Sequence, residues 1–119
     1  MNVPKMLRSF KYAFQGIRVL MHENNARFHL LATVVVILTG FLVKLSPIEW
    51  TIMCIIIGLV WVAEAFNTAL EKLCDFVSPQ HHPLIGKVKD LAAGGVLIIS
   101  LLAVIIGIIL FLPKILAYL

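Results

Sequence analysis

The longest uncharged stretch of this chain is the feature that most limits how it can fold. Leu91–Leu112 is a run of 22 residues without a charged side chain, and Ser100 carries its only hydroxyl group. A helix needs about 20 apolar residues to cross the hydrocarbon core of a bilayer, which is about 30 Å thick. Because backbone polar groups must be paired within that core, this segment is predicted to be a transmembrane α-helix.

Two further segments have the same character. Residues 28–45 are apolar apart from His29 and Lys44, and a second apolar stretch occupies residues 48–70 after a turn predicted at Ser46–Pro47. Of all 119 residues, 61% are hydrophobic and 13% are charged, whereas soluble domains contain about 45–50% and about 25%. The composition excludes an ordinary soluble domain. It predicts an all-α membrane protein with a single domain spanning residues 1–119 and transmembrane segments at 28–45, 48–70 and 91–112.

The second of these segments is unusual because its uncharged part is too short. The fourteen residues from Trp50 to Ala63 carry no charge, but they rise only about 21 Å as a helix. To cross the bilayer, the helix must continue to about Ala69, which carries Glu64 and Asn67 into the membrane.

The distribution of basic residues predicts the orientation. Eight of the ten Lys and Arg residues fall before the first span or between the second and third spans: Lys5, Arg8, Lys11, Arg18, Arg27, Lys72, Lys87 and Lys89. Since cytoplasmic loops are enriched in Lys and Arg, both the N-terminus and the polar end of the second span are predicted to be cytoplasmic.

Residues 1–27 are predicted to form an amphipathic helix on the membrane surface. One stripe at helical spacing is apolar (Leu7, Phe10, Phe14, Ile17 and Met21), and a neighbouring stripe is polar and mainly basic (Arg8, Lys11, Gln15 and Arg18). A basic amphipathic helix is suited to an anionic cytoplasmic leaflet. No cleavable signal peptide is expected, because the first apolar run begins only at residue 28.

The polar end of the second span is the candidate functional site. Residues at the spacing i, i+3, i+4, i+7 and i+11 lie on one side of a helix, and here they are Glu64, Asn67, Thr68, Glu71 and Asp75. Such a stripe must face protein, water or a ligand. Three carboxylates favour a divalent cation such as Mg²⁺, and a deeply placed Glu64 fits a general base. Helix association or an ion path would also account for the stripe.

The predicted cytoplasmic loop adds groups that suit phosphate chemistry. The stretch "PQHHPLIGKVKD" supplies His81, His82, Lys89 and Asp90, of which Lys89 could bind phosphate and Asp90 could orient Lys89 or a metal. No GxxxxGK[ST] motif is present. The residues alone indicate a metal-assisted site at the cytoplasmic interface. The main alternative is a non-enzymatic ion or proton path through the Glu64 stripe, which would have no need of the basic loop. A lipid phosphatase ranks lower, because no nucleophile stands beside the stripe.

The segment "EAFNTALEKLCD" resembles the signature of the bacterial diacylglycerol kinase and undecaprenol kinase family, which consists of small integral membrane lipid kinases. The similarity continues through "HHPLIGKVKDLAAGGVL" and upstream through "ENNARFHL". It covers essentially the whole chain.

This resemblance implies a homotrimeric helical bundle with active sites shared between protomers, in the cytoplasmic (inner) membrane of a bacterium. It implies Mg²⁺-dependent transfer of the γ-phosphate of ATP to the hydroxyl of a membrane lipid. The acceptor would be undecaprenol, giving undecaprenyl phosphate, or diacylglycerol, giving phosphatidic acid. The sequence "HHPLIGKVKDLAAGG" resembles the undecaprenol kinase branch more closely. The expected partners are the lipid substrate, ATP, the bilayer and further copies of the chain, with no nucleic acid.

The resemblance also implies roles for individual residues. Glu64 would be the general base, and Glu23 and Glu71 the Mg²⁺ ligands. Asn67, Thr68 and Asp75 would support the active site. The ATP-binding residues would be Lys5, Tyr12, Glu23, Glu71, Gln80, His81, His82, Lys89 and Asp90.

Overall fold

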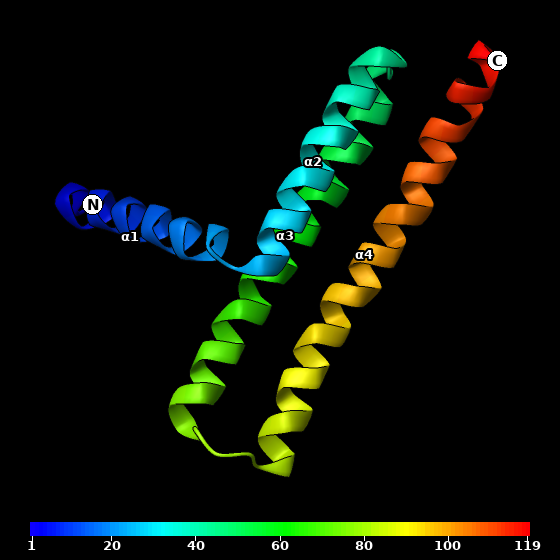
Figure 1. Cartoon of the computed structure of the whole chain (residues 1–119). Coiled ribbons are helices and arrows are strands. Elements are labelled where there is room, and N and C mark those ends of the chain that lie inside the picture. The colour runs from blue at the N-terminus through cyan, green and yellow to red at the C-terminus, as the bar shows by residue number, and fades with distance from the viewer.

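The protein consists of four α-helices and no strands. A computed structural model describes residues 1–119, in the order α1 (Val3–Met21), α2 (Asn24–Leu42), α3 (Pro47–Val77) and α4 (Pro83–Tyr118). In Figure 1, α2, α3 and α4 run alongside one another, while α1 projects away from them. Helices α2, α3 and α4 are each long and apolar enough to cross a membrane. The predicted all-α class with three such helices is confirmed.

Each predicted span falls on one of these helices. Helix α2 covers most of the segment 28–45, while α3 contains the segment 48–70 and α4 contains the segment 91–112. The homotrimer, the position of the membrane boundaries and the contact of α1 with a membrane surface stay predictions.

The turn between α2 and α3 is defined by hydrogen bonds at both helix ends. Lys44 has a φ of 58°, and the Leu45 N–H donates to the Gly40 carbonyl over 3.1 Å, which ends α2 in a Schellman motif. Ser46 caps α3: its Oγ accepts from the Glu49 N–H, and its own N–H donates to Glu49 Oε1. Pro47 occupies the first helical turn, where its missing N–H is not needed. The turn predicted at Ser46–Pro47 is confirmed.

A close contact at Gly40 holds α2 against α3. A Cβ atom at Gly40 would lie 2.7 Å from Cη2 of Trp50 and 3.0 Å from Cδ1 of Leu45. The Trp50 ring is also packed against Phe41, with ring centroids 4.8 Å apart. Only glycine therefore allows this separation of the two helices.

The Gly40→Ala variant is expected to lose about 1–3 kcal/mol of stability, because the added methyl group must displace the indole ring. Gly58→Ala is the matched control, since no atom lies within 4 Å of the Cβ it would add. Thermal unfolding in detergent micelles measures both variants. Equal stability of the two would contradict the proposed contact.

Helix α3 has one buried face, whose character changes along its length. The face is apolar at Met53, Ile56 and Val60, and it continues as the polar residues Glu64 and Asn67. Met53 and Ile56 join Val43 and Leu45 in the main hydrophobic cluster. Near the end of α4 and the beginning of α3, Lys114 and Glu49 form an ion pair of 3.1 Å.

The lengths of the helices place the polar half of α3 at one end of the bundle. The 19 residues of α2 rise about 28 Å, whereas the 31 residues of α3 rise about 46 Å. The two helices are antiparallel, so Trp50 lies beside Gly40 and Glu64 lies beside His29. Helix α3 consequently extends past the beginning of α2, as Figure 1 shows. Glu71 and Asp75 are on this extension.

Candidate functional site

The predicted polar stripe on α3 is deeply buried in its first half. The exposed fractions are 2% for Glu64, 6% for Asn67 and 7% for Thr68. Glu71 is half-buried and Asp75 is exposed. The stripe therefore runs from the protein interior to the end of the bundle, and its deep part faces protein. An ionised or polar group in such surroundings is costly unless it has a partner, which makes the partners informative.

Glu64 has one titratable neighbour, and it comes from α2. Nε2 of His29 lies 3.4 Å from Oε2 of Glu64, within the range of an ion pair. This oxygen is buried and accepts no hydrogen bond. The His29 ring is in edge contact with Trp61, with ring centroids 6.1 Å apart. Helix α2 thus contributes a side chain to the site that the stripe on α3 did not indicate.

Asn67 connects the deep and shallow parts of the stripe. Its Nδ2 donates to Oε1 of Glu71 over 3.1 Å, as their i, i+4 spacing allows. Its Oδ1 is buried and has no hydrogen-bond partner. Asn67 therefore fixes the Glu71 carboxylate and leaves one acceptor oxygen free at the boundary between the buried and exposed halves.

The exposed end of the stripe meets the beginning of α4. Lys89 donates a hydrogen bond to Oδ1 of Asp75, so the two helices are joined by a charged pair across the loop. Next to this pair is a polar hollow of about 270 Å³ that is almost free of apolar side chains. It is lined by Asp75, Ser78, Pro79, Gln80, His81, His82, Ile85, Gly86 and Lys89. The sequence-predicted loop residues Gln80, His81 and His82 are thus brought together with Lys89.

Glu23 lies at the junction of α1 and α2, close to the extension of α3. Its Oε1 is 3.5 Å from Nζ of Lys72, the residue that follows Glu71. Glu23 and Glu71 both keep part of their surface exposed. The chain has no cluster of three or more His, Cys, Asp or Glu side chains arranged around a common metal position. Mg²⁺ is often bound by one or two carboxylates together with substrate phosphates, so the oxygen donors of Glu23 and Glu71 fit that chemistry.

The predicted residues of α1 and the residue that follows Lys89 form no side-chain hydrogen bond or ion pair with this site. Lys5 and Tyr12 lie on α1, and both are exposed. Their helix projects away from the bundle in Figure 1. Asp90 follows Lys89 on α4, but Lys89 is paired with Asp75 instead. The role of Asp90 stays a prediction.

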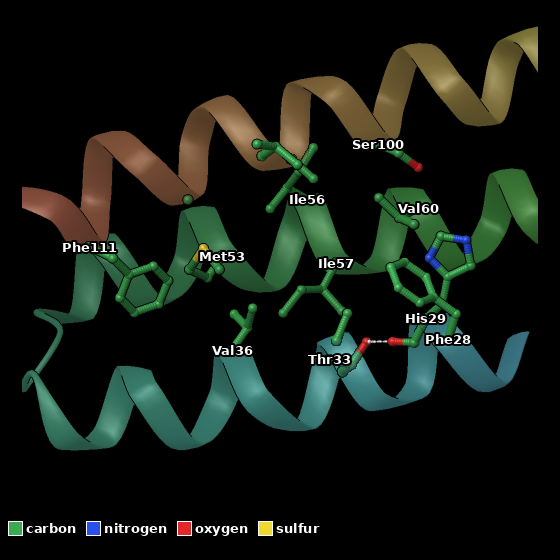
Figure 2. Close-up of a pocket in the computed structure, with 14 residues that line it drawn as sticks. Phe28, His29, Thr33, Val36, Met53, Ile56, Ile57, Val60, Ser100 and Phe111 are labelled. Atoms are coloured by element: carbon green, nitrogen blue, oxygen red, sulfur yellow. Dashed lines mark hydrogen bonds between the residues drawn. The ribbon is translucent and has the colours of Figure 1, made fainter. Parts of the chain in front are cut away.

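A mostly apolar cavity of about 290 Å³ lies between α2, α3 and α4. Figure 2 shows His29 and Ser100 at one end of it and Phe111 at the other, with Met53 and Ile56 along its wall. The Ser100 Oγ is buried and has no hydrogen-bond partner. The cavity thus has a polar end beside His29 and an apolar body.

His29 is a member of the site that the sequence motifs did not indicate. In the sequence it only interrupts an apolar segment, although an ionisable residue within a predicted span is itself a signal of function. Its partner could not be identified from the sequence, because the contact depends on the register between α2 and α3.

Comparison with known proteins gives a consistent result over almost the entire chain. Residues 11–111 match the family model described as prokaryotic diacylglycerol kinase. The chain is 41% identical to the undecaprenol kinase of Bacillus subtilis over 111 residues, which is 92% of this chain and 90% of that protein.

Two further relatives are diacylglycerol kinases. The chain is 37% identical to that of Synechocystis over 116 residues, covering 96% of this chain and 66% of the relative. It is 30% identical to that of Helicobacter pylori over 106 residues, covering 82% of each. The similarity extends from α1 to α4 and includes every element that carries a candidate site residue.

Proposed function

Since the chain belongs to the prokaryotic diacylglycerol kinase family and is a lipid kinase, we propose that it transfers the γ-phosphate of ATP to the hydroxyl of a membrane lipid at the cytoplasmic interface. The observation that supports this best is the stripe on α3. It presents a carboxylate with 2% exposure at Glu64 and partly exposed carboxylates at Glu71 and Asp75, on one continuous helix. A lipid near Glu64 and a soluble nucleotide near Glu71 can therefore meet along the same face of α3.

Glu64 is the proposed general base. As the lipid oxygen attacks the γ-phosphorus, a new P–O bond forms and the bond from this phosphorus to the β,γ-bridging oxygen breaks. ADP leaves, and Glu64 accepts the proton of the lipid hydroxyl. Phosphoryl transfer depends mainly on positioning and charge stabilisation, so a carboxylate held at a fixed depth suits this step. Its buried position beside α2 favours the lipid as the source of that proton.

Glu71 and Glu23 are the proposed Mg²⁺ ligands. When bound, the ion neutralises charge on the ATP phosphates and orients them. Asn67 holds the Glu71 carboxylate through the 3.1 Å hydrogen bond, which is an orienting contact of the kind that metal-binding carboxylates commonly have. Lys72 keeps Glu23 near the same part of α3.

The polar hollow beside Lys89 is the proposed position of the nucleotide. Lys89 is a point charge suited to phosphate, and its contact with Asp75 places it at the mouth of the hollow. Gln80, His81 and His82 line the hollow, and Asp90 follows Lys89. Lys5 and Tyr12 are proposed to contact the nucleotide from α1, whose exposed side chains are free to do so. Thr68 supports the site beside Asn67.

Undecaprenol is the acceptor that the comparisons favour, because the relative that is 41% identical is named an undecaprenol kinase. Diacylglycerol is the second candidate, since relatives that are 37% and 30% identical are named diacylglycerol kinases. We further propose a homotrimer in the cytoplasmic membrane with the N-terminus inside. The placement of eight of the ten basic residues supports this orientation.

The test is phosphate transfer from labelled ATP by the purified protein in mixed micelles. Undecaprenol and diacylglycerol are offered separately, with Mg²⁺ and with the ion removed by a chelator. We expect Mg²⁺-dependent labelling of undecaprenol in excess of diacylglycerol. Preferential labelling of diacylglycerol would reverse the acceptor assignment, and labelling without Mg²⁺ would contradict the role given to Glu23 and Glu71.

A further inference from the structure

His29 stands apart from the groups whose roles the family resemblance supplied. Its Nε2 lies 3.4 Å from Oε2 of Glu64. This carboxylate oxygen is buried and has no hydrogen-bond partner. A direct N–H···O hydrogen bond is about 2.9 Å long, so a small rotation of either side chain would form one. Catalytic hydrogen bonds are often longer in the absence of substrate and shorten when it binds.

Two neighbours contact His29: Thr33 bonds to its backbone carbonyl, and Trp61 packs against its ring. Thr33, one helical turn along α2, donates from Oγ1 to the His29 carbonyl oxygen over 2.7 Å. The same Oγ1 accepts a hydrogen bond of 3.0 Å from Nε1 of Trp61 on α3. Figure 2 shows the bond between Thr33 and His29 on α2, beside the wall of the cavity. Trp61 is in edge contact with the imidazole ring, so α2 and α3 together fix its position.

The cavity beside His29 is lined by no other ionisable side chain. The residues of α4 that line the same cavity include Ser100 and otherwise Ala103, Val104, Gly107 and Phe111, none of which titrates. Glu64 supplies the only carboxylate within ion-pair distance of the ring. A buried carboxylate oxygen without a hydrogen-bond partner is costly, and His29 is the side chain placed to donate to it.

We propose that His29 is a positioning residue for Glu64. Its Nε2–H donates to Oε2 of Glu64, which keeps the carboxylate directed toward the lipid hydroxyl. The role requires the imidazole tautomer that carries its proton on Nε2. This inference rests on the proposed kinase function and on Glu64 as its base. In this proposal, a side chain of α2 orients the catalytic carboxylate of α3.

The variants His29→Leu and His29→Gln test this role in the labelled-ATP assay. We expect His29→Leu to lower kcat by about tenfold to a hundredfold, as expected for a displaced catalytic group, with the KM for ATP unchanged. His29→Gln retains an N–H donor and is expected to recover part of the lost kcat. An unchanged kcat in His29→Leu would overturn the proposal, as would equal loss in both variants.

A double-mutant cycle separates positioning from a general structural effect. Glu64→Asp withdraws the carboxylate from the ring, so adding His29→Leu to it is expected to change kcat by no more than about twofold. A full additional loss would show that His29 acts independently of Glu64 and would overturn the proposal.

Two threonines on α2 provide a matched pair of controls. Thr33 and Thr39 each donate over 2.7 Å to the carbonyl four residues earlier, but only Thr33 accepts from Trp61. Thr33→Val is therefore expected to reduce kcat several-fold, whereas Thr39→Val is expected to leave it unchanged. Equal effects would contradict the role of Thr33 in holding Trp61 beside His29.

If the unmodified protein labels no lipid, the proposed function itself fails. If it labels lipid and His29→Leu does so equally well, only the present inference fails.

Discussion

Substitution of Glu64 by glutamine is expected to abolish lipid phosphorylation while the protein stays folded and continues to bind ATP. Glutamine has nearly the same size and can occupy the same buried position beside His29, but it cannot accept the proton of the lipid hydroxyl. Loss of a general base typically lowers the rate by about 10²–10⁴-fold. The decrease should appear in kcat, because Glu64 lies deeper than the groups proposed to hold the nucleotide.

The measurement compares kcat and ATP affinity for the unmodified protein, Glu64→Gln and Glu49→Gln. Glu49 is the matched control because it lies on the same helix at the opposite end, where it caps α3 and pairs with Lys114. A glutamine at this position can still complete the capping box, so activity should be retained. Normal turnover in Glu64→Gln would refute its assignment as the base.

Substitution of Glu71 by glutamine is expected to produce a second large loss of activity, of a different kind. Removing one of two proposed carboxylate ligands weakens Mg²⁺ binding, so kcat/KM for ATP should fall by about 10–100-fold or more, and the Mg²⁺ concentration needed for half-maximal activity should rise. The hydrogen bond from Asn67 can be retained by the glutamine oxygen, so the helix should be undisturbed.

Binding of ATP in the presence of Mg²⁺ distinguishes this variant from Glu64→Gln. Calorimetric titration should show weakened binding in Glu71→Gln and normal binding in Glu64→Gln, because only the former is proposed to contact the ion. Unchanged Mg²⁺ dependence in Glu71→Gln would remove Glu71 from the metal site.

The helices were predictable because the membrane permits few alternatives. An uncharged run such as Leu91–Leu112 can satisfy its backbone in a bilayer only as a helix, and α4 contains this run. The limits of the helices were less predictable. Helix α2 ends at Leu42 because Lys44 adopts a left-handed conformation, which a hydropathy pattern does not reveal. Helix α3 continues to Val77, seven residues beyond the predicted span, so a hydropathy pattern does not mark its end.

The candidate site was predictable only where it lies on one helix. The spacing of Glu64, Asn67 and Glu71 is sufficient to place them on one side of α3, and the hydrogen bond between Asn67 and Glu71 follows from it. Contacts between helices depend on register and could not be derived. The pairing of Asp75 with Lys89 and the approach of His29 to Glu64 both belong to this group. The stripe alone predicted that a metal ion would relieve the repulsion among the carboxylates, whereas in the structure His29 of α2 and Lys89 of α4 also lie against them.

The continuity of α3 makes the bilayer itself part of the proposed reaction geometry. Glu64 and Glu71 are seven residues apart on an unbroken helix, so about 10 Å of axial rise separates the proposed base from the proposed metal ligand. Neither group can change depth without the other. If Glu64 is the base, a membrane lipid must bring its hydroxyl to the depth of Glu64, and hydrophobic mismatch between the 19-residue α2 and the surrounding lipid would change how far that hydroxyl has to move. In such an arrangement, acceptors are discriminated by how far their hydroxyl can rise toward the interface as well as by the shape of the molecule that carries it.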